Sequence, residues 1–248
     1  MCKAKNKHIV NILDIPFHDM SHLEAIDAIH KIIGSESAQQ VVLANAHTLN
    51  LACSDLEYQK CLQQAAMVLR DGTGVKLASI FAGQHLRYNF VGTDFIPRLL
   101  AELCQDKVSV FLFGAKPGVA YAAARQLLSH YPDLTIVGCE HGYLPREEWD
   151  STIVSRINRA RPHILLVALG NPLQEEWIAK NLCRLDIKVA IGVGALFDYL
   201  AGEVSRAPKW MRRIGFEWLY RLVVEPRRLW RRYIIGNCQF LYRVISLS

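Results

Sequence analysis

The segment VSVFLFGAKPGVAYAAARQLLSH, residues 108–130, decides the fold of this chain. Residues 108–113 form an almost continuous run of apolar side chains, which is typical of a strand buried on both faces. Residues 114–118 contain two glycines and a proline, which predict a turn, and the apolar side chains that follow recur at helical spacing. A buried strand, a short turn and a helix make up most of a βαβ unit, so the segment predicts a parallel sheet.

The same alternation recurs along the chain. Further buried strands are predicted at residues 8–13, 40–45, 134–137, 163–169 and 188–193. Helices are predicted at residues 21–33, 49–64, 95–104, 146–160 and 174–185. Strand followed by helix, repeated, predicts an α/β fold with a Rossmann-like, mostly parallel sheet and helices on both faces.

The positive charge of the chain is concentrated near its C-terminus. Residues 206–243 contain ten Lys and Arg against two Glu, whereas the whole chain of 248 residues has a net charge of +6, so the rest is net acidic. Tryptophan, tyrosine and phenylalanine are interleaved with these cations. We therefore predict an α/β body at residues 1–202 and a basic, amphipathic helical appendage at residues 203–248, suited to phosphate groups or an anionic membrane surface.

Several classes of protein are disfavoured. No apolar stretch reads as a signal peptide or reaches the roughly 18 residues of a spanning helix, which predicts a cytoplasmic protein. Seven scattered cysteines without a C-x-x-C pair predict reduced thiols and no zinc site. A nucleic-acid-binding protein would also have a basic, aromatic arm, but no recognised nucleic-acid motif is present and the net acidic body is not needed for that role.

Polar and glycine-rich segments follow the predicted strands. They are residues 45–48, 70–74, 114–118, 142–143, 170–174 and 192–194. Ligands of such sheets bind beyond the carboxyl ends of the strands, where glycine lets the backbone approach a phosphate, although the turns alone also require glycine. Neither G-x-G-x-x-G nor a P-loop is present, which disfavours a nicotinamide dehydrogenase or an NTPase.

Four blocks of the sequence carry a resemblance to a known family. They are DGTGVKLA (71–78), FLFGAKPGVA (111–120), ALGNPLQEEW (168–177) and GVGALFDYLAGEVSRAPKWMRRIGFEWLYRLVVEPRRLWRRY (192–233). The chain resembles the bacterial WecG/TagA/CpsF glycosyltransferases. The resemblance implies an inverting enzyme that moves a sugar from a UDP donor to a polyprenyl-diphosphate-linked acceptor at the inner face of the cell membrane, in surface polysaccharide or teichoic acid linkage synthesis.

The resemblance leaves the sugar open. N-acetylmannosamine is the first expectation, and UDP-glucose or UDP-N-acetylmannosaminuronic acid are the alternative donors. A catalytically silent scaffold is the alternative from another class. The expected partners are the UDP-sugar, the lipid-linked acceptor and the anionic membrane surface, with a homo-oligomer also possible and no nucleic acid.

The resemblance also implies catalytic residues. Asp71 matches the carboxylate that takes the acceptor proton, although it could instead cap the helix that follows it. Thr48 matches a polar residue near the reacting centre. Arg221, Arg228 and Arg231 match arginines placed on the donor diphosphate. The sequence contains no Asp-x-Asp pair of the kind that holds a metal in many sugar transferases, so no metal and no cofactor are expected.

Substrate-binding residues are expected from two sources. The strand ends give Asn45, Gly114 and Lys116, and the resemblance implies that Tyr143, Gln174 and Asp198 line the UDP pocket. Gln174 could instead serve its own helix terminus, and no role is assigned to His47 or His141. In the appendage, Pro226 predicts that one helix ends near residue 224 and another begins. Its apolar stripe (Trp230, Tyr233, Ile234 and Leu241) either closes the active site at the membrane or packs permanently on the body or another copy.

Overall fold

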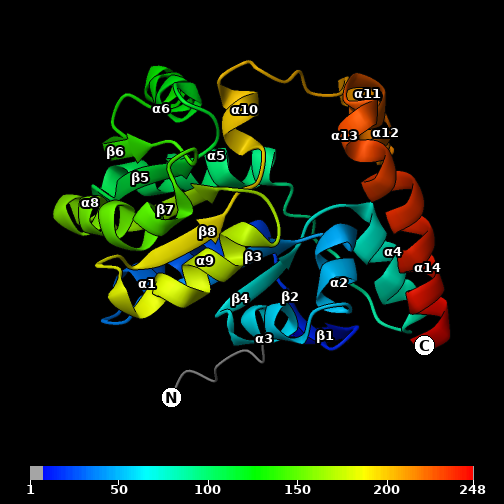
Figure 1. The fold of residues 1–248 in the computed structure, drawn as a ribbon. Helices are drawn as coiled ribbons and strands as arrows, with labels where there is room; N and C mark the ends of the chain where they lie inside the picture. Colours follow the sequence, from blue (N-terminus) through cyan, green and yellow to red (C-terminus); the bar gives the residue numbers. More distant parts are fainter. Residues whose placement is uncertain (1–7, 248) are drawn as a thin grey trace. The chain divides into compact units, whose positions relative to one another are not determined.

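The computed structural model describes residues 8–247 and is shown in Figure 1. Its strands are β1 (His8–Ile12), β2 (Ile15–Asp19), β3 (Gln39–Ala44), β4 (Met67–Arg70), β5 (Ser109–Gly114), β6 (Thr135–Glu140), β7 (Ile164–Ala168) and β8 (Val189–Gly192). Its α-helices are α1 (His22–Ile33), α2 (Ala46–Ala52), α3 (Leu56–Gln64), α4 (Thr73–Phe81), α5 (Gly92–Leu103), α6 (Val119–His130), α7 (Arg146–Glu148), α8 (Val154–Ala160), α9 (Leu173–Asn181), α10 (Leu196–Leu200), α11 (Lys209–Arg213), α12 (Glu217–Val224), α13 (Pro226–Trp230) and α14 (Gly236–Leu247). Short 3-10 turns η1 (Cys104–Asp106) and η3 (Leu182–Arg184) and π turns η2 (Trp149–Ile153) and η4 (Arg231–Ile235) complete the chain.

The predicted α/β fold is confirmed. Six strands form a sheet in the order β4-β3-β8-β7-β5-β6, and the pairs β3–β8, β8–β7, β7–β5 and β5–β6 are parallel. Phe111 and Phe113 of β5 pack on one face with Trp149 and Trp177, next to α8 and α9. Because side chains alternate along a strand, the buried Leu112 faces the opposite side, where α6 packs against β5 and β6. Helices therefore cover both faces, as the continuous apolar strands predict (Figure 1).

The first predicted strand is placed wrongly. Residues 8–12 do not join the parallel sheet; β1 instead pairs antiparallel with β2, which the sequence analysis missed. Leu13 and Asp14 form the connecting turn with φ of 50° and 62°. This left-handed pair is the geometry of a tight type I′ hairpin, which usually carries Asn and Gly. Leu-Asp gives no such signal, so the hairpin was not recognised.

The predicted helix at residues 49–64 is in fact two helices, α2 and α3. Asp55 interrupts it, because its Oδ1 accepts hydrogen bonds from the backbone N–H groups of Glu57 (2.9 Å) and Tyr58 (3.1 Å) and so begins a new helix. The break after Val224 is confirmed, since α13 begins at Pro226.

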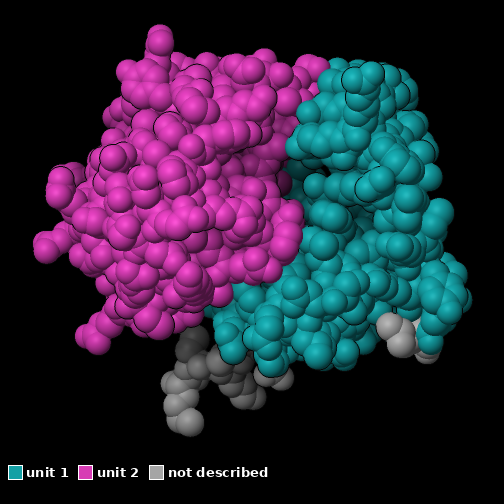
Figure 2. All heavy atoms as spheres, viewed as in Figure 1, with its two compact units in different colours: residues 1–24, 44–91, 206–248 teal, residues 25–43, 92–205 magenta. Residues whose placement is uncertain are grey.

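The chain divides into two compact units, coloured in Figure 2. Unit 1 consists of residues 1–24, 44–91 and 206–248, and unit 2 consists of residues 25–43 and 92–205. The predicted boundary after Gly202 lies close to the start of the last segment of unit 1, but residues 206–248 belong to the same unit as residues 44–91 of the predicted body. Among the described residues, no helix is long and apolar enough to cross a membrane.

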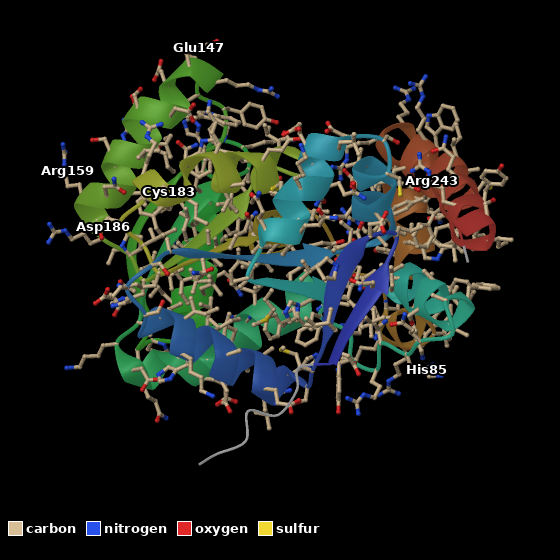
Figure 3. The ribbon with its side chains drawn as sticks, turned by 90° about the horizontal axis from the view of Figure 1, so that it is seen from below. His85, Glu147, Arg159, Cys183, Asp186 and Arg243 are labelled. Carbon is tan, nitrogen blue, oxygen red and sulfur yellow. The ribbon has the colours of Figure 1, made fainter. Side chains whose placement is uncertain are left out.

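Within unit 1, α14 packs against α2 and α4. Phe240 and Val244 are buried, and Arg243 donates hydrogen bonds to the Asn50 carbonyl (2.6 Å) and to Ser54 Oγ (2.8 Å). Arg243 is labelled on α14 in Figure 3. Helix α14 is thus packed on the rest of its unit. The predicted apolar stripe is not fully covered, because Trp230 and Ile234 remain 42% and 53% exposed.

Candidate active site

Asp71 lies in a turn that the surrounding backbone holds in place. Its N–H donates to the carbonyl of Ala44 (2.8 Å), and the N–H of Gly72, at φ +93°, donates to Asn89 Oδ1 (2.7 Å). The buried guanidinium of Arg70 donates to the carbonyls of Gly72 (2.9 Å) and Tyr88 (2.7 Å). The side chains of Asn89 and Arg70 therefore both support the turn at Gly72.

Asp71 does not cap the helix that follows it. The N-cap of α4 is Gly72, which has no side-chain capping bond. The alternative role considered for Asp71 is therefore excluded, and its carboxyl group instead accepts a side-chain hydrogen bond from Asn45.

Asn45 connects the start of α2 to this carboxyl group. Its Oδ1 accepts hydrogen bonds from the N–H groups of His47 (3.0 Å) and Thr48 (3.2 Å), and Thr48 Oγ1 accepts from the Asn45 N–H (3.2 Å). Because the side-chain oxygen of Asn45 already accepts hydrogen bonds from the N–H groups of α2, its side-chain nitrogen is the group that donates to Asp71. Thr48 is fully buried and completes a capping box, so it orients Asn45 from within the helix terminus.

Burial raises the pKa of Asp71 to about 6. The Asn45 hydrogen bond lowers it, Glu217 raises it, and the positive charges of Arg232 and Arg221 lower it. A carboxylate whose pKa lies near neutrality is a stronger proton acceptor than an ordinary aspartate and is still mostly ionised at pH 7. Asp71 therefore has the properties of a general base.

The C-terminal helices bring cations to this carboxylate. Arg221 of α12 and Arg232 of the π turn η4 both interact electrostatically with Asp71, and Arg228 of α13 interacts with Arg232. Burial lowers the pKa of Arg232, and the neighbouring Arg221 and Arg228 act in the same direction. Its Nε is buried and has no hydrogen-bond partner among the described residues. Guanidinium groups that converge in this way suit an anionic ligand such as a diphosphate.

The predicted arginines are thus not equivalent in the structure. Arg228 forms an ion pair with Glu225. Arg231 is exposed, and its guanidinium lies 5.4 Å from the centre of the Trp230 ring. Arg232, which the sequence analysis did not select, is the neighbour of Asp71.

His47 lies beside the same group of charges. Burial, reinforced by Arg232, lowers the pKa of its imidazole to about 4. His47 is therefore neutral at physiological pH and presents a hydrogen-bonding ring rather than a further cation.

The other predicted binding residues lie in unit 2, in the loops after its strands. Gly114 has φ +127°, and a Cβ there would lie 2.4 Å from the Ala168 carbonyl oxygen, so β5 and β7 require glycine for their close approach. The Gly142 N–H donates to the Ala115 carbonyl (3.0 Å), which joins the loops that carry Lys116 and Tyr143.

Lys116 is exposed and Tyr143 is 66% exposed, so both side chains are available to a ligand. Asp198 lies on α10, which packs against α5 and α6, and its carbonyl accepts the N–H groups of Glu203 and Val204.

Gln174 has a structural role in the loops. It is buried, and its Oε1 accepts the N–H groups of Gly170 (3.2 Å) and Gly194 (3.0 Å), which tie the loop after β7 to the loop after β8. Its Nε2 donates to Glu175 (2.7 Å), and Asn171 donates to the same carboxyl oxygen (2.9 Å). All polar atoms of the Gln174 side chain thus contact protein groups, so its contribution to a ligand site is to position these two loops.

Comparisons with known proteins point to one family. The model of the glycosyl transferase WecG/TagA/CpsF family matches residues 10–247. A protein of Staphylococcus aureus (strain MRSA252) is 32% identical over 244 residues, covering 98% of this chain and 94% of its own length. A protein of Bacillus subtilis (strain 168) is 33% identical over 225 residues, covering 90% of this chain and 86% of its own. Both are named N-acetylglucosaminyldiphosphoundecaprenol N-acetyl-beta-D-mannosaminyltransferase.

This chain belongs to the WecG/TagA/CpsF glycosyltransferase family. The expectation of a transferase is therefore confirmed, and the scaffold and nucleic-acid alternatives lose their support. Within this glycosyltransferase, no cluster of three or more His, Cys, Asp or Glu among residues 8–247 could hold a metal ion. The six cysteines in that part of the chain are free thiols.

Arg231 and Arg232 of this glycosyltransferase are adjacent and have the same chemistry, so the sequence alone did not single out Arg232. Adjacent side chains on a helix point in different directions, and in the structure Arg232 is the one that interacts with Asp71. No residue pattern in Arg231–Ile235 predicts the π turn η4 or which arginine side chain lies near Asp71. Asn45 was selected as a ligand-binding residue, and the capping pattern N-x-x-T could have indicated its additional role at the helix terminus.

Proposed function

We propose that this glycosyltransferase moves N-acetylmannosamine from a UDP donor, with inversion, to a hydroxyl group of an N-acetylglucosaminyl-diphospho-polyprenol. The names of the S. aureus and B. subtilis relatives support the sugar and the acceptor. The observation that carries the chemistry is the position of the Asp71 carboxyl group beside Arg221 and Arg232 in one compact unit.

In the proposed reaction, the ionised Asp71 accepts the proton of the acceptor hydroxyl as its oxygen bonds to the anomeric carbon of the donor sugar. The bond from that carbon to the β-phosphate oxygen breaks, and the electron pair leaves with UDP. Arg221 and Arg232, with Arg228 behind them, neutralise the charge that develops on the diphosphate. Guanidinium groups supply the countercharge in this scheme, so we propose that transfer requires no divalent metal.

A donor panel tests this proposal. UDP-N-acetylmannosamine, UDP-glucose and UDP-N-acetylmannosaminuronic acid are each incubated with the lipid-linked acceptor, with and without EDTA, and the glycosylated lipid is measured by mass spectrometry. We expect product from UDP-N-acetylmannosamine, unchanged by EDTA, and almost none from Asp71→Asn. Asp27→Asn, at an exposed position on α1, is the matched control. Normal turnover of Asp71→Asn would remove the proposed base.

We further propose that the protein acts at the inner face of the cell membrane without spanning it. The C-terminal helices support this, because exposed Trp210, Val223 and Tyr242 (63%, 73% and 73%) lie in a segment rich in arginine. Apolar side chains with cations around them suit an anionic lipid surface. Sedimentation with vesicles that contain phosphatidylglycerol, compared with neutral vesicles, tests this location.

A further inference from the structure

Helix α4 has an exposed apolar face. Leu77, Ile80 and Phe81 are 49%, 47% and 55% exposed, whereas Val75 and Ala78 are buried. The exposed residues are spaced i, i+3 and i+4, so they share one side of the helix. The buried Val75 and Ala78 lie on the opposite side, which packs against the rest of unit 1. Isolated exposed apolar side chains are ordinary, but three on one turn of one helix form a surface.

This face extends onto the segment between α11 and α12. Thr73 lies one turn before Leu77 on the same side of α4, and a Cβ at Gly215 would lie 2.5 Å from Thr73 Cγ2. The two residues flanking Gly215, Ile214 and Phe216, are 57% and 44% exposed. We call Leu77, Ile80, Phe81, Ile214 and Phe216 the α4 surface.

The charges of the surrounding segments are almost all positive. Residues 73–91 and 206–247 contain two acidic side chains, Glu217 and Glu225, and both are partly buried. Glu225 pairs with Arg228, and Glu217 lies 3.8 Å from Arg206. An apolar face within a cationic region complements an anionic lipid surface. The same charges oppose self-association, because two copies would bring like charges together.

The position of α4 relative to Asp71 gives the face a function. Helix α4 begins two residues after Asp71, and its nine residues extend about 13 Å from that end. An amphipathic helix at a membrane buries its apolar face about 5–10 Å into the headgroup and acyl boundary. A helix that contacts lipid along this face therefore keeps the carboxylate at its N-terminal end close to the headgroup level.

We propose that the α4 surface binds the lipid of the membrane in which the acceptor is anchored, and so brings Asp71 to the sugar carried on the acceptor diphosphate. The inference rests on the proposed function for the identity of the acceptor. To the C-terminal segment, which already contributes Ile214 and Phe216, the proposal adds helix α4, which begins directly after the turn that carries Asp71.

The test replaces the three α4 side chains together, as Leu77→Gln, Ile80→Gln and Phe81→Gln, since glutamine keeps helix propensity. Leu56→Gln is the matched control, because Leu56 lies in the same unit on α3 and is 72% exposed. Each protein is sedimented with vesicles of phosphatidylcholine and phosphatidylglycerol. We expect the triple variant to lose about tenfold or more in partitioning and the control to be unchanged.

Transfer is then measured with two acceptors, a vesicle-embedded polyprenyl-linked sugar and a short-chain, water-soluble analogue. We expect the triple variant to lose activity on the first and to keep it on the second. Unchanged partitioning and activity, or a wild-type dimer that the triple variant converts to a monomer in sedimentation velocity, would overturn the proposal. If the wild-type protein transfers sugar to neither acceptor, the proposed function is wrong. The proposal for the α4 surface then depends on the vesicle sedimentation of the triple variant and its control alone.

Discussion

Adjacent arginines show how finely the active site depends on backbone geometry. Arg231 extends over the Trp230 ring at the surface, whereas Arg232 has a buried Nε and interacts with Asp71. The sequence offers the same cation at both positions. Adjacent residues of a helix face different directions, so the packing of this segment decides which of the two lies near the carboxylate.

We therefore predict unequal effects of Arg232→Ala and Arg231→Ala. Loss of Arg232 removes a cation from the site of the departing diphosphate and should lower kcat/KM by about 100-fold or more. Arg231→Ala should lower it less than about threefold, because exposed charges contribute little. Arg232→Lys should not restore activity, since an ammonium group lacks the planar, bidentate geometry. Steady-state kinetics of the three variants, with thermal unfolding as the control for folding, decide the matter; equal losses at both positions would contradict the assignment.

The raised pKa of Asp71 predicts the pH dependence of activity. With a pKa of about 6, the base is protonated below that pH, so kcat/KM should fall as the pH is lowered through about 6 rather than through 4. The measurement is a pH profile of kcat/KM for the acceptor, at acceptor concentrations well below KM, with Asp71→Glu as a comparison that keeps a carboxyl group. A profile that stays flat down to pH 5 would mean that Asp71 is not the base.

The same shift predicts a cost in stability. Burial raises the pKa of Asp71 from 3.8 to about 6, so the folded state binds the proton more tightly than the unfolded chain does. Protonation of Asp71 therefore stabilises the folded state, and this stabilisation is lost as the pH rises from 3.8 through 6. Asp71→Asn should therefore stabilise the fold at pH 8 by up to about 3 kcal/mol and have little effect at pH 4. Denaturant unfolding at both pH values measures the difference, and destabilisation at pH 8 would be the contrary outcome.

At the scale of elements, the sequence predicted most where apolar patterning and position agree. The strand in residues 108–113 and the helix that follows were identified because both faces of β5 are buried and a glycine turn lies between them. The hairpin at Leu13 and Asp14 was missed because its left-handed backbone has no glycine or asparagine to announce it. Side-chain capping by Asp55 likewise divides a pattern that otherwise reads as one helix.

Helix α14 offers a test of how the appendage is held. Phe240 is 2% exposed, whereas the adjacent Leu241 is 41% exposed. Phe240→Ala should lower the free energy of unfolding by about 3–5 kcal/mol because it leaves a cavity between α14 and its neighbours. Leu241→Ala should change it by about 0.5 kcal/mol or less. Urea unfolding followed by circular dichroism gives both values, and similar small effects would show that α14 is only loosely docked.

At the scale of the whole molecule, the candidate site depends on segments that are far apart in the sequence. Unit 1 contains both Asp71 and residues 206–248, which the predicted division after Gly202 assigns to different parts of the chain. The sequence analysis could not establish which cations of a region with ten Lys and Arg would turn inward, because helical faces depend on packing that no local pattern encodes. Resemblance supplied the list of candidates, and tertiary contacts then ranked Arg232 and Arg221 above Arg231.

Truncation after Ser205 tests this organisation of the units. It removes α14 and uncovers the parts of α2 and α4 on which that helix packs, together with the hydrogen bonds from Arg243 to Asn50 and Ser54. We expect hydrogen–deuterium exchange to accelerate in α2 and α4 and to stay slow in β5, β7 and α8, whose core lies within unit 2. Arg243→Ala in the full chain should produce a weaker form of the same change, limited to α2. If α2 and α4 stayed protected from exchange after the truncation, residues 206–248 would not stabilise these two helices. A segment that stabilises its neighbours must leave them less protected when it is removed.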